Sequence, residues 1–194
     1  MGVYRGVTQD NITVQGGTLY DITVQGGSSS GFIVPFLDIS GRKYGQFYST
    51  QTQTPVTNTP TALTFNNSES FNTGVSVVSN SRITYTTTGI YNITVSVQFN
   101  NTKNTNDHEA YLWFRKNGTD IANSNTVVTV PKANDGGKGF LEISIIESIT
   151  ANQYIEAITM VEDSDVDIEY IAASVGPPVV PAVPSVIYTT HRIG

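Results

Sequence analysis

The chain has 194 residues, no cysteine and a formal net charge of −6 at pH 7, and charged residues make up 13% of it. The lack of cysteine excludes disulfides and thiolate chemistry. Its ten Lys and Arg residues are scattered, which argues against a protein that binds nucleic acid. No apolar run approaches the ~20 residues of a membrane helix, and the start lacks the apolar core of a signal peptide, so we expect no membrane partner.

A short duplication occupies the N-terminal part of the chain. The hexapeptide Ile-Thr-Val-Gln-Gly-Gly at 12–17 recurs at 22–27, and a Ser/Gly-rich linker follows up to Gly31. Each copy is one very short strand, too small to bury a core by itself. We predict that residues 1–31 form an arm, which is either a flexible or hairpin-like tail or a segment that orders against a partner by strand addition. The apolar residues expected to dock this arm are Ile12, Val14, Leu19, Tyr20, Ile22 and Val24.

Residues 32–43 are predicted to connect this arm to the main domain, which would span 44–194. Pro35 interrupts an apolar segment in the connector, as is typical of an edge strand or an extended link. The first strands of the main domain are expected at 44–48, 63–65 and 75–78.

The strongest structural signal is the stretch 82–100. After a Thr-rich turn that ends at Gly89, apolar side chains alternate with polar ones. A period of two is typical of an antiparallel strand with one buried face. Such a face needs a second sheet to cover it, so the pattern predicts a sandwich. The apolar positions are Tyr91, Ile93, Val95, Val97 and Phe99.

The rest of the chain continues as short strands separated by turns. Asn117 and Gly118 predict a hairpin turn, because both residue types tolerate positive φ. No segment has a helical pattern, so we expect an all-β sandwich or barrel. Strands are expected at 110–116, 121–124, 126–130, 140–149, 153–160, 166–172 and 186–189.

Several motifs carry a resemblance to a known family. They are Tyr-Gly-Gln-Phe-Tyr at 44–48, Ser-Arg-Ile-Thr-Tyr at 81–85, Gly-Ile-Tyr at 89–91 with the strand that follows, Trp-Phe-Arg-Lys-Asn-Gly at 113–118, and the segments 121–124, 128–131 and 184–187. In order and spacing they resemble the jelly-roll domain of the complement globular-head and tumour necrosis factor superfamily, and more closely its version in bacteriophage virion proteins. The family usually has Gly-Asp where this chain has Asn152-Gln153.

The resemblance implies a homotrimeric jelly-roll β-sandwich. A physical reason points the same way, because the chain carries more apolar and aromatic residues than one small sandwich can hide. We therefore expect core or trimer contacts from Tyr91, Phe99, Trp113 and Phe114. The alternation of Tyr111 and Trp113 could also be a carbohydrate platform, but packing between sheets or at a subunit contact is favoured.

An acidic segment near the C-terminus is the one candidate for metal binding. If it is a strand, Asp163, Asp165, Asp167 and Glu169 share one face. An EF-hand is excluded, because Ile168 stands where the loop glycine should be. A solvated face is favoured. Cross-subunit ion pairing and calcium, with Asp163, Asp165 and Asp167 as ligands, are the alternatives.

No catalytic constellation is evident, so we expect no enzyme and no cofactor. The two histidines, His108 and His191, have neither triad nor metal spacing, and no Gly-x-Ser-x-Gly motif is present. The expected function is that of a bacteriophage capsid decoration protein. Made in the host cytoplasm, it would sit on the outer capsid surface as a trimer whose arms dock on the major capsid protein. The alternative is a tail or head fibre tip that binds a host-surface receptor or glycan.

Overall fold

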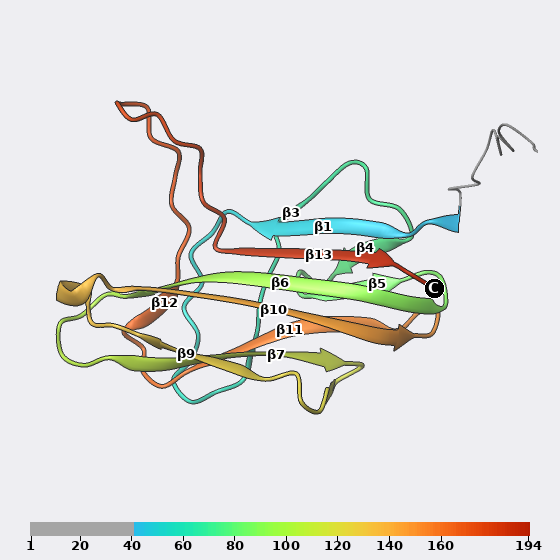
Figure 1. Cartoon of the computed structure of the whole chain (residues 1–194), viewed down its shortest axis with the longest axis horizontal. Helices are drawn as coiled ribbons and strands as arrows, with labels where there is room; N and C mark the ends of the chain where they lie inside the picture. The colour runs from blue at the N-terminus through green and yellow to red at the C-terminus, as the bar shows by residue number, and fades with distance from the viewer. Residues whose placement is uncertain (1–40) are drawn as a thin grey trace, which may run out of the picture. The chain divides into compact units, whose positions relative to one another are not determined.

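Two antiparallel β-sheets pack face to face in the computed structural model, which describes residues 41–194 (Figure 1). These residues belong to one compact unit. The prediction of an all-β sandwich is therefore confirmed. The predicted arm, with Ile12, Val14, Leu19, Tyr20, Ile22 and Val24, lies outside the described residues, as does the connector up to residue 40.

The first sheet has six strands in the order β10-β6-β13-β1-β3, with β12 also paired to β6. Its long central strand β6 pairs along almost its whole length with β10 on one side, and with β13 on the other. The strands are β1 (Tyr44–Ser49), β3 (Asn67–Ser68), β6 (Gly89–Asn101), β10 (Lys138–Ile149), β12 (Val166–Ile168) and β13 (Val186–Arg192).

The second sheet has seven strands in the order β4-β5-β11-β7-β8, with β2 paired to β11 and β9 paired to β7. The strands are β2 (Thr61–Ala62), β4 (Val75–Val78), β5 (Arg82–Tyr85), β7 (His108–Lys116), β8 (Thr119–Asp120), β9 (Thr126–Val130) and β11 (Tyr154–Val161). Residues 41–194 contain one short 3₁₀ turn, Ala133–Asp135, and no helix long and apolar enough to cross a membrane.

The eight principal strands pair in a nested way. Strand β1 pairs with β13, β5 with β11, β6 with β10, and β7 with β9. Counted in chain order, these pairs join the first strand to the eighth, the second to the seventh, the third to the sixth and the fourth to the fifth. Successive pairs alternate between the two sheets, as they would if one long antiparallel ribbon were wrapped around the core.

The core lies between the sheets and follows the predicted alternation. In β6 every second side chain from Tyr91 to Phe99 is buried. Burial of this alternating face is the main favourable term for such a sandwich, at about 25 cal/mol per Å² of apolar surface. The aromatic side chains Phe47, Phe65 and Tyr188 stack edge to face within it.

Two predicted strands, at 63–65 and 121–124, are wrong, because side-chain hydrogen bonds interrupt the ladder of backbone hydrogen bonds there. Residues 63–65 are irregular although Leu63 and Phe65 are buried, since the side chain of Gln53 bonds the backbone N–H and the hydroxyl of Thr64. Residues 121–124 do not form the predicted return strand of the hairpin with β7. There the hydroxyl of Ser124 accepts a hydrogen bond from the backbone N–H of Phe114 at 3.1 Å.

Candidate functional site

The outer face of the first sheet is almost free of charge. Strand alternation places on it side chains from β1, β6, β10 and β13. Glu142 is the one carboxylate in this set, and Lys138, at the start of β10, is its one Lys or Arg residue and donates to Asn100 Oδ1 at 2.9 Å. Its members are Tyr44, Gln46, Tyr48, Ile90, Asn92, Thr94, Ser96, Gln98, Asn100, Lys138, Phe140, Glu142, Ser144, Ile146, Ser148, Ile187, Thr189 and His191. We call this set the outer face.

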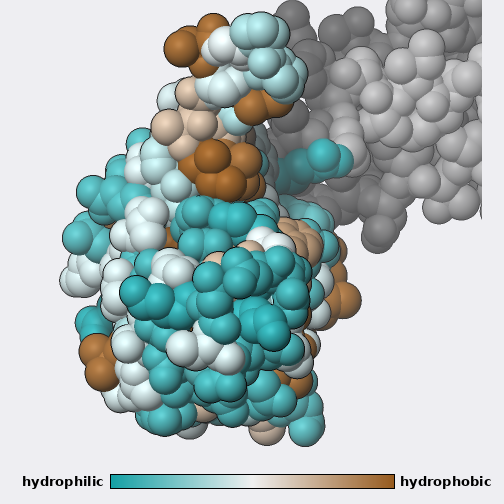
Figure 2. Space-filling model, turned by 90° about the vertical axis from the view of Figure 1, so that its left-hand side faces the viewer, coloured by the Kyte–Doolittle hydropathy of each residue, from teal (hydrophilic) through white to brown (hydrophobic). Residues whose placement is uncertain are grey.

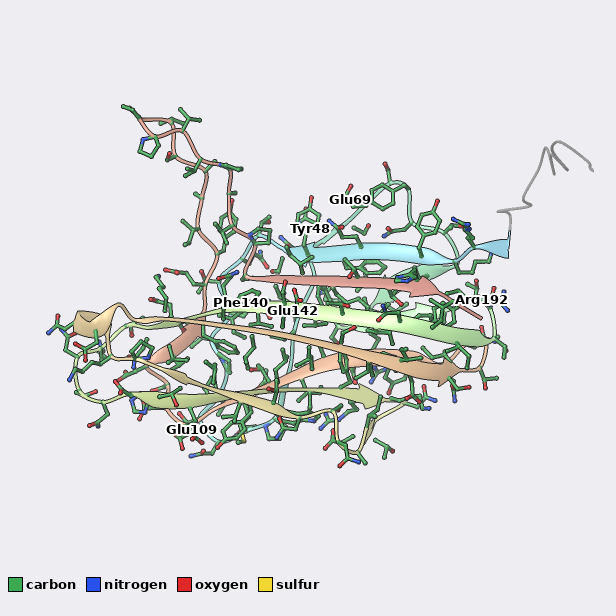
Figure 3. The ribbon with its side chains drawn as sticks, viewed as in Figure 1. Tyr48, Glu69, Glu109, Phe140, Glu142 and Arg192 are labelled. Carbon is green, nitrogen blue, oxygen red and sulfur yellow. The ribbon has the colours of Figure 1, made fainter. Side chains whose placement is uncertain are left out.

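Large apolar groups stand on the outer face around a hydrogen-bonded centre. Phe140 and Ile146 are 52% and 66% exposed. Between them the hydroxyl of Ser144 lies 2.9 Å from that of Thr94 and donates to Asn92 Oδ1 at 2.9 Å. Figure 3 shows Tyr48, Phe140 and Glu142 on this sheet. The outer face thus combines small, internally satisfied polar groups with exposed aromatic and aliphatic ones.

A surface without any charged residue projects from the body of the sandwich. The segment 171–183 links β12 to β13 and leaves the body as a narrow loop (Figure 1). A bridge between Ile171 and Val183 closes its base. Val175 and Val179 are 99% and 76% exposed, and the segment has no charged residue. Figure 2 shows its hydrophobic groups above a mostly hydrophilic end of the sandwich. We call it the projecting segment.

A cleft of about 400 Å³ lies on the outside of the second sheet. Its walls include the side chains of Tyr111, Trp113 and Met160, with Asp120 and Asn125 among the polar groups. The Asp120 carboxylate accepts hydrogen bonds from Trp113 Nε1 at 2.9 Å and from Arg115 Nε at 2.8 Å, and both contacts lower its pKa. Because the alternate residues of β7 fill the core, Trp113 faces away from it. This position corrects the core half of the expectation for Trp113, packing between the sheets, and leaves a subunit contact as the other half.

The acidic segment does not form the predicted four-carboxylate row. Asp163 and Asp165 lie in the turn between β11 and β12, and β12 ends at Ile168, so the predicted strand 166–172 is too long. Asp167 lies within β12, opposite Asn100. Glu169 pairs with Lys138. The three calcium candidates therefore do not converge on one face, and the structure separates Asp167 from the other two.

His108, which is not among the predicted metal ligands, lies close to the turn that carries Asp163 and Asp165. A ring nitrogen of His108 and one carboxylate oxygen each from Asp163 and Asp165 all lie within 4.8 Å of one another. These are the residues that could hold a metal ion within 41–194. The sequence pattern does not reveal this cluster, because His108 is far from the two aspartates along the chain. The only signal was that His108 stands in an acidic, polar segment.

The remaining candidate contacts are placed in the core. Tyr91, Phe99 and Phe114 are buried between the sheets.

In the comparisons with known proteins, no family model matches this chain and no curated protein matches it. The function of the chain must therefore be inferred from the surfaces described above.

Proposed function

We propose that residues 44–194 form a jelly roll of the type found in the complement globular-head and tumour necrosis factor superfamily. The support is the nested pairing of eight principal strands, first with eighth through to fourth with fifth. A jelly roll is this arrangement of eight antiparallel strands in two sheets. A fold of this kind hosts many functions, so the function must be argued from the surfaces.

The outer face supports a homotrimer. Subunit contacts are depleted of charge at their centre and enriched in aromatic side chains. The outer face has this composition, with Tyr48, Phe140 and Ile187 on it and Glu142 as its one carboxylate. Packing it against the sister subunits would hide these groups and would close a ring around a threefold axis.

The function we propose for this trimer is that of a capsid decoration protein on the outer surface of a bacteriophage head. The observation that carries it is that one small domain presents two surfaces with few or no charged groups, the outer face and the projecting segment. One would serve trimer assembly, and the other, with the arm formed by residues 1–31, would contact the major capsid protein. Three linked weak contacts bind a lattice tightly, because the second and third form at high effective concentration.

The decisive experiment is co-sedimentation with capsid shells that lack the protein. We expect the full chain to saturate the shells, and a variant without residues 1–31 to remain a folded trimer but to sediment with shells at least tenfold more weakly. A Val175→Ser, Val179→Ser variant separates the part played by the projecting segment from that of the arm. Saturation by the truncated protein at the same concentration would refute docking through the arm.

The cleft on the second sheet favours a second candidate function, that of a fibre tip that binds a host-surface glycan. Tyr111 and Trp113 offer aromatic faces for a sugar ring, and Asp120 and Asn125 offer hydrogen-bond partners for its hydroxyls. We would measure binding of the full chain to bacterial surface polysaccharide. Binding that is lost in Trp113→Ala and kept in Trp113→Phe would favour this function over decoration.

A further inference from the structure

One imidazole nitrogen in the described part of the chain is buried without a hydrogen-bond partner. It is Nε2 of His108, at the start of β7. His108 shares the strand face of Ala110, Leu112 and Phe114, whose side chains fill the core, so the ring points toward the space between the sheets. A buried polar atom with no partner costs free energy, so such an atom in a native protein calls for an explanation.

Two carboxylates meet this ring at the end of the sandwich. They belong to Asp163 and Asp165, whose oxygens lie within 4.8 Å of a ring nitrogen of His108 and of each other. The turn that carries them is held in place. Asp165 N donates to Asp163 Oδ1 at 3.0 Å, and the backbone oxygen of Asp165 accepts hydrogen bonds from Thr102 N and Oγ1 at 2.9 and 3.0 Å. The three groups are therefore presented by ordered backbone.

The negative charge at this end of the sandwich is not neutralised within the described residues. None of the ion pairs in 41–194 involves Asp163 or Asp165. Glu109 and Glu162 add to the charge, and Glu162 Oε2 accepts a hydrogen bond from Glu109 N. A cation bound between the two aspartates would relieve this repulsion.

We propose that His108, Asp163 and Asp165 bind one divalent transition-metal ion of the Zn²⁺ class. Calcium takes about six to eight oxygen ligands and does not select imidazole, whereas zinc is bound by one imidazole nitrogen together with carboxylate oxygens. Three protein ligands leave the fourth position of a tetrahedral site to water. Ligand atoms in such a site are roughly 3.3 Å apart, so small rotations of the carboxylates complete it.

The ion would join parts of the chain that are far apart in sequence. His108 opens β7, while Asp163 and Asp165 follow β11. Strands β7 and β11 are antiparallel neighbours in the second sheet, so the start of β7 lies beside the end of β11. The ion would link the two strands at this point. It would stabilise this end of the domain, independent of the surfaces that the proposed function uses.

The test is calorimetric titration of the chelator-treated full chain with Zn²⁺, and separately with Ca²⁺. We expect one Zn²⁺ per chain, and a melting temperature that rises by several degrees with Zn²⁺ and not with Ca²⁺. His108→Gln and Asp165→Asn should each weaken Zn²⁺ binding at least tenfold. The matched control is Asp167→Asn, which removes a neighbouring carboxylate outside the cluster and should leave the affinity within about twofold.

The proposal fails if the full chain binds no Zn²⁺, if His108→Gln binds it as tightly as the parent, or if Ca²⁺ binds more tightly than Zn²⁺. Circular dichroism of each variant shows whether it is folded. Asp165→Asn serves in place of His108→Gln if the latter does not fold. These outcomes are independent of capsid binding, since none of the three residues lies on the outer face or on the projecting segment.

Discussion

A pair of tyrosine hydroxyls crosses the core from one sheet to the other. The hydroxyls of Tyr85 on β5 and Tyr188 on β13 lie 2.8 Å apart, and Tyr85 also donates to Thr190 Oγ1 at 3.3 Å. Both rings are fully buried. Since polar groups in a core must be paired, this contact helps to specify how the two sheets align.

We expect the two hydroxyls to differ in their contribution to stability. Tyr85→Phe removes the one hydrogen bond that the Tyr188 hydroxyl makes within residues 41–194, and it should lower the free energy of unfolding by about 2 kcal/mol. Tyr188→Phe leaves Tyr85 with Thr190 and should cost about 1 kcal/mol. Urea denaturation measures both.

The double variant and a control outside the core test the physical reason. Tyr85→Phe with Tyr188→Phe should cost less than the sum of the single changes, because no hydroxyl is then left unpaired. Tyr48→Phe on the outer face should change stability by less than about 0.5 kcal/mol. Additive effects of the two core substitutions would argue against the pairing.

The same two phenols should make the fold sensitive to alkaline pH. Burial raises the pKa of Tyr85 and of Tyr188 above the ordinary value of 10.0. The unfolded chain therefore loses these protons at a lower pH than the folded chain. The two phenols should leave stability unchanged below about pH 10 and should lower it as the pH rises above their ordinary pKa.

Urea denaturation at a series of pH values from neutral to strongly alkaline, followed by phenolate absorbance, measures this loss. In the Tyr85→Phe, Tyr188→Phe variant the decline above the ordinary pKa should be shallower. An equal decline in both proteins would assign the effect to other groups.

At the scale of elements, the turn after β7 depends on two residues with positive φ. Asn117 and Gly118 have φ of 49° and 84°, and the turn pairs Lys116 with Thr119. A Cβ on Gly118 would meet no atom closer than the Tyr154 hydroxyl at 3.8 Å. Any cost of a side chain there is therefore due to the backbone.

We predict that Gly118→Ala lowers the free energy of unfolding by about 1 kcal/mol, because an L-residue disfavours the left-handed region. Urea denaturation measures this cost. Gly176→Ala is the matched control, since a Cβ there meets no atom within 4 Å and its φ lies outside the left-handed region. A destabilisation of similar size in both variants would contradict the backbone explanation.

At the scale of the whole molecule, we predict a trimer assembled through the outer face. Ile146→Lys puts a charge on that face at a position that is 66% exposed in the single subunit, and we expect it to dissociate the trimer. Burying an unpaired ammonium at a subunit contact is costly. Sedimentation velocity at micromolar concentration measures the assembly state.

The control for that substitution lies on the other sheet. Val127→Lys changes a residue of β9 that is 49% exposed, and it should leave the trimer intact. A parent protein that sediments as a monomer would refute the trimer. Dissociation by Val127→Lys but not by Ile146→Lys would place the contact on the second sheet instead.

The fold class, most strands and the inward face of β6 could be predicted from the sequence, because alternation with a period of two is a local property. Both errors at 63–65 and 121–124 have one cause. Those segments have the composition of strands, but the side chain of Gln53 accepts from the backbone N–H of Thr64, and the hydroxyl of Ser124 accepts from that of Phe114 in β7. Residue patterns do not reveal such bonds.

The sequence by itself determined the all-β class, the Asn117-Gly118 turn and the uncharged character of the segment 171–183. Only the tertiary structure decided that Trp113 faces outward and that His108 meets Asp163 and Asp165. The reason is physical. Alternation shows that a strand has two faces, but which face meets the core, and which distant residues share an end of the sandwich, depends on pairing between strands far apart in the chain.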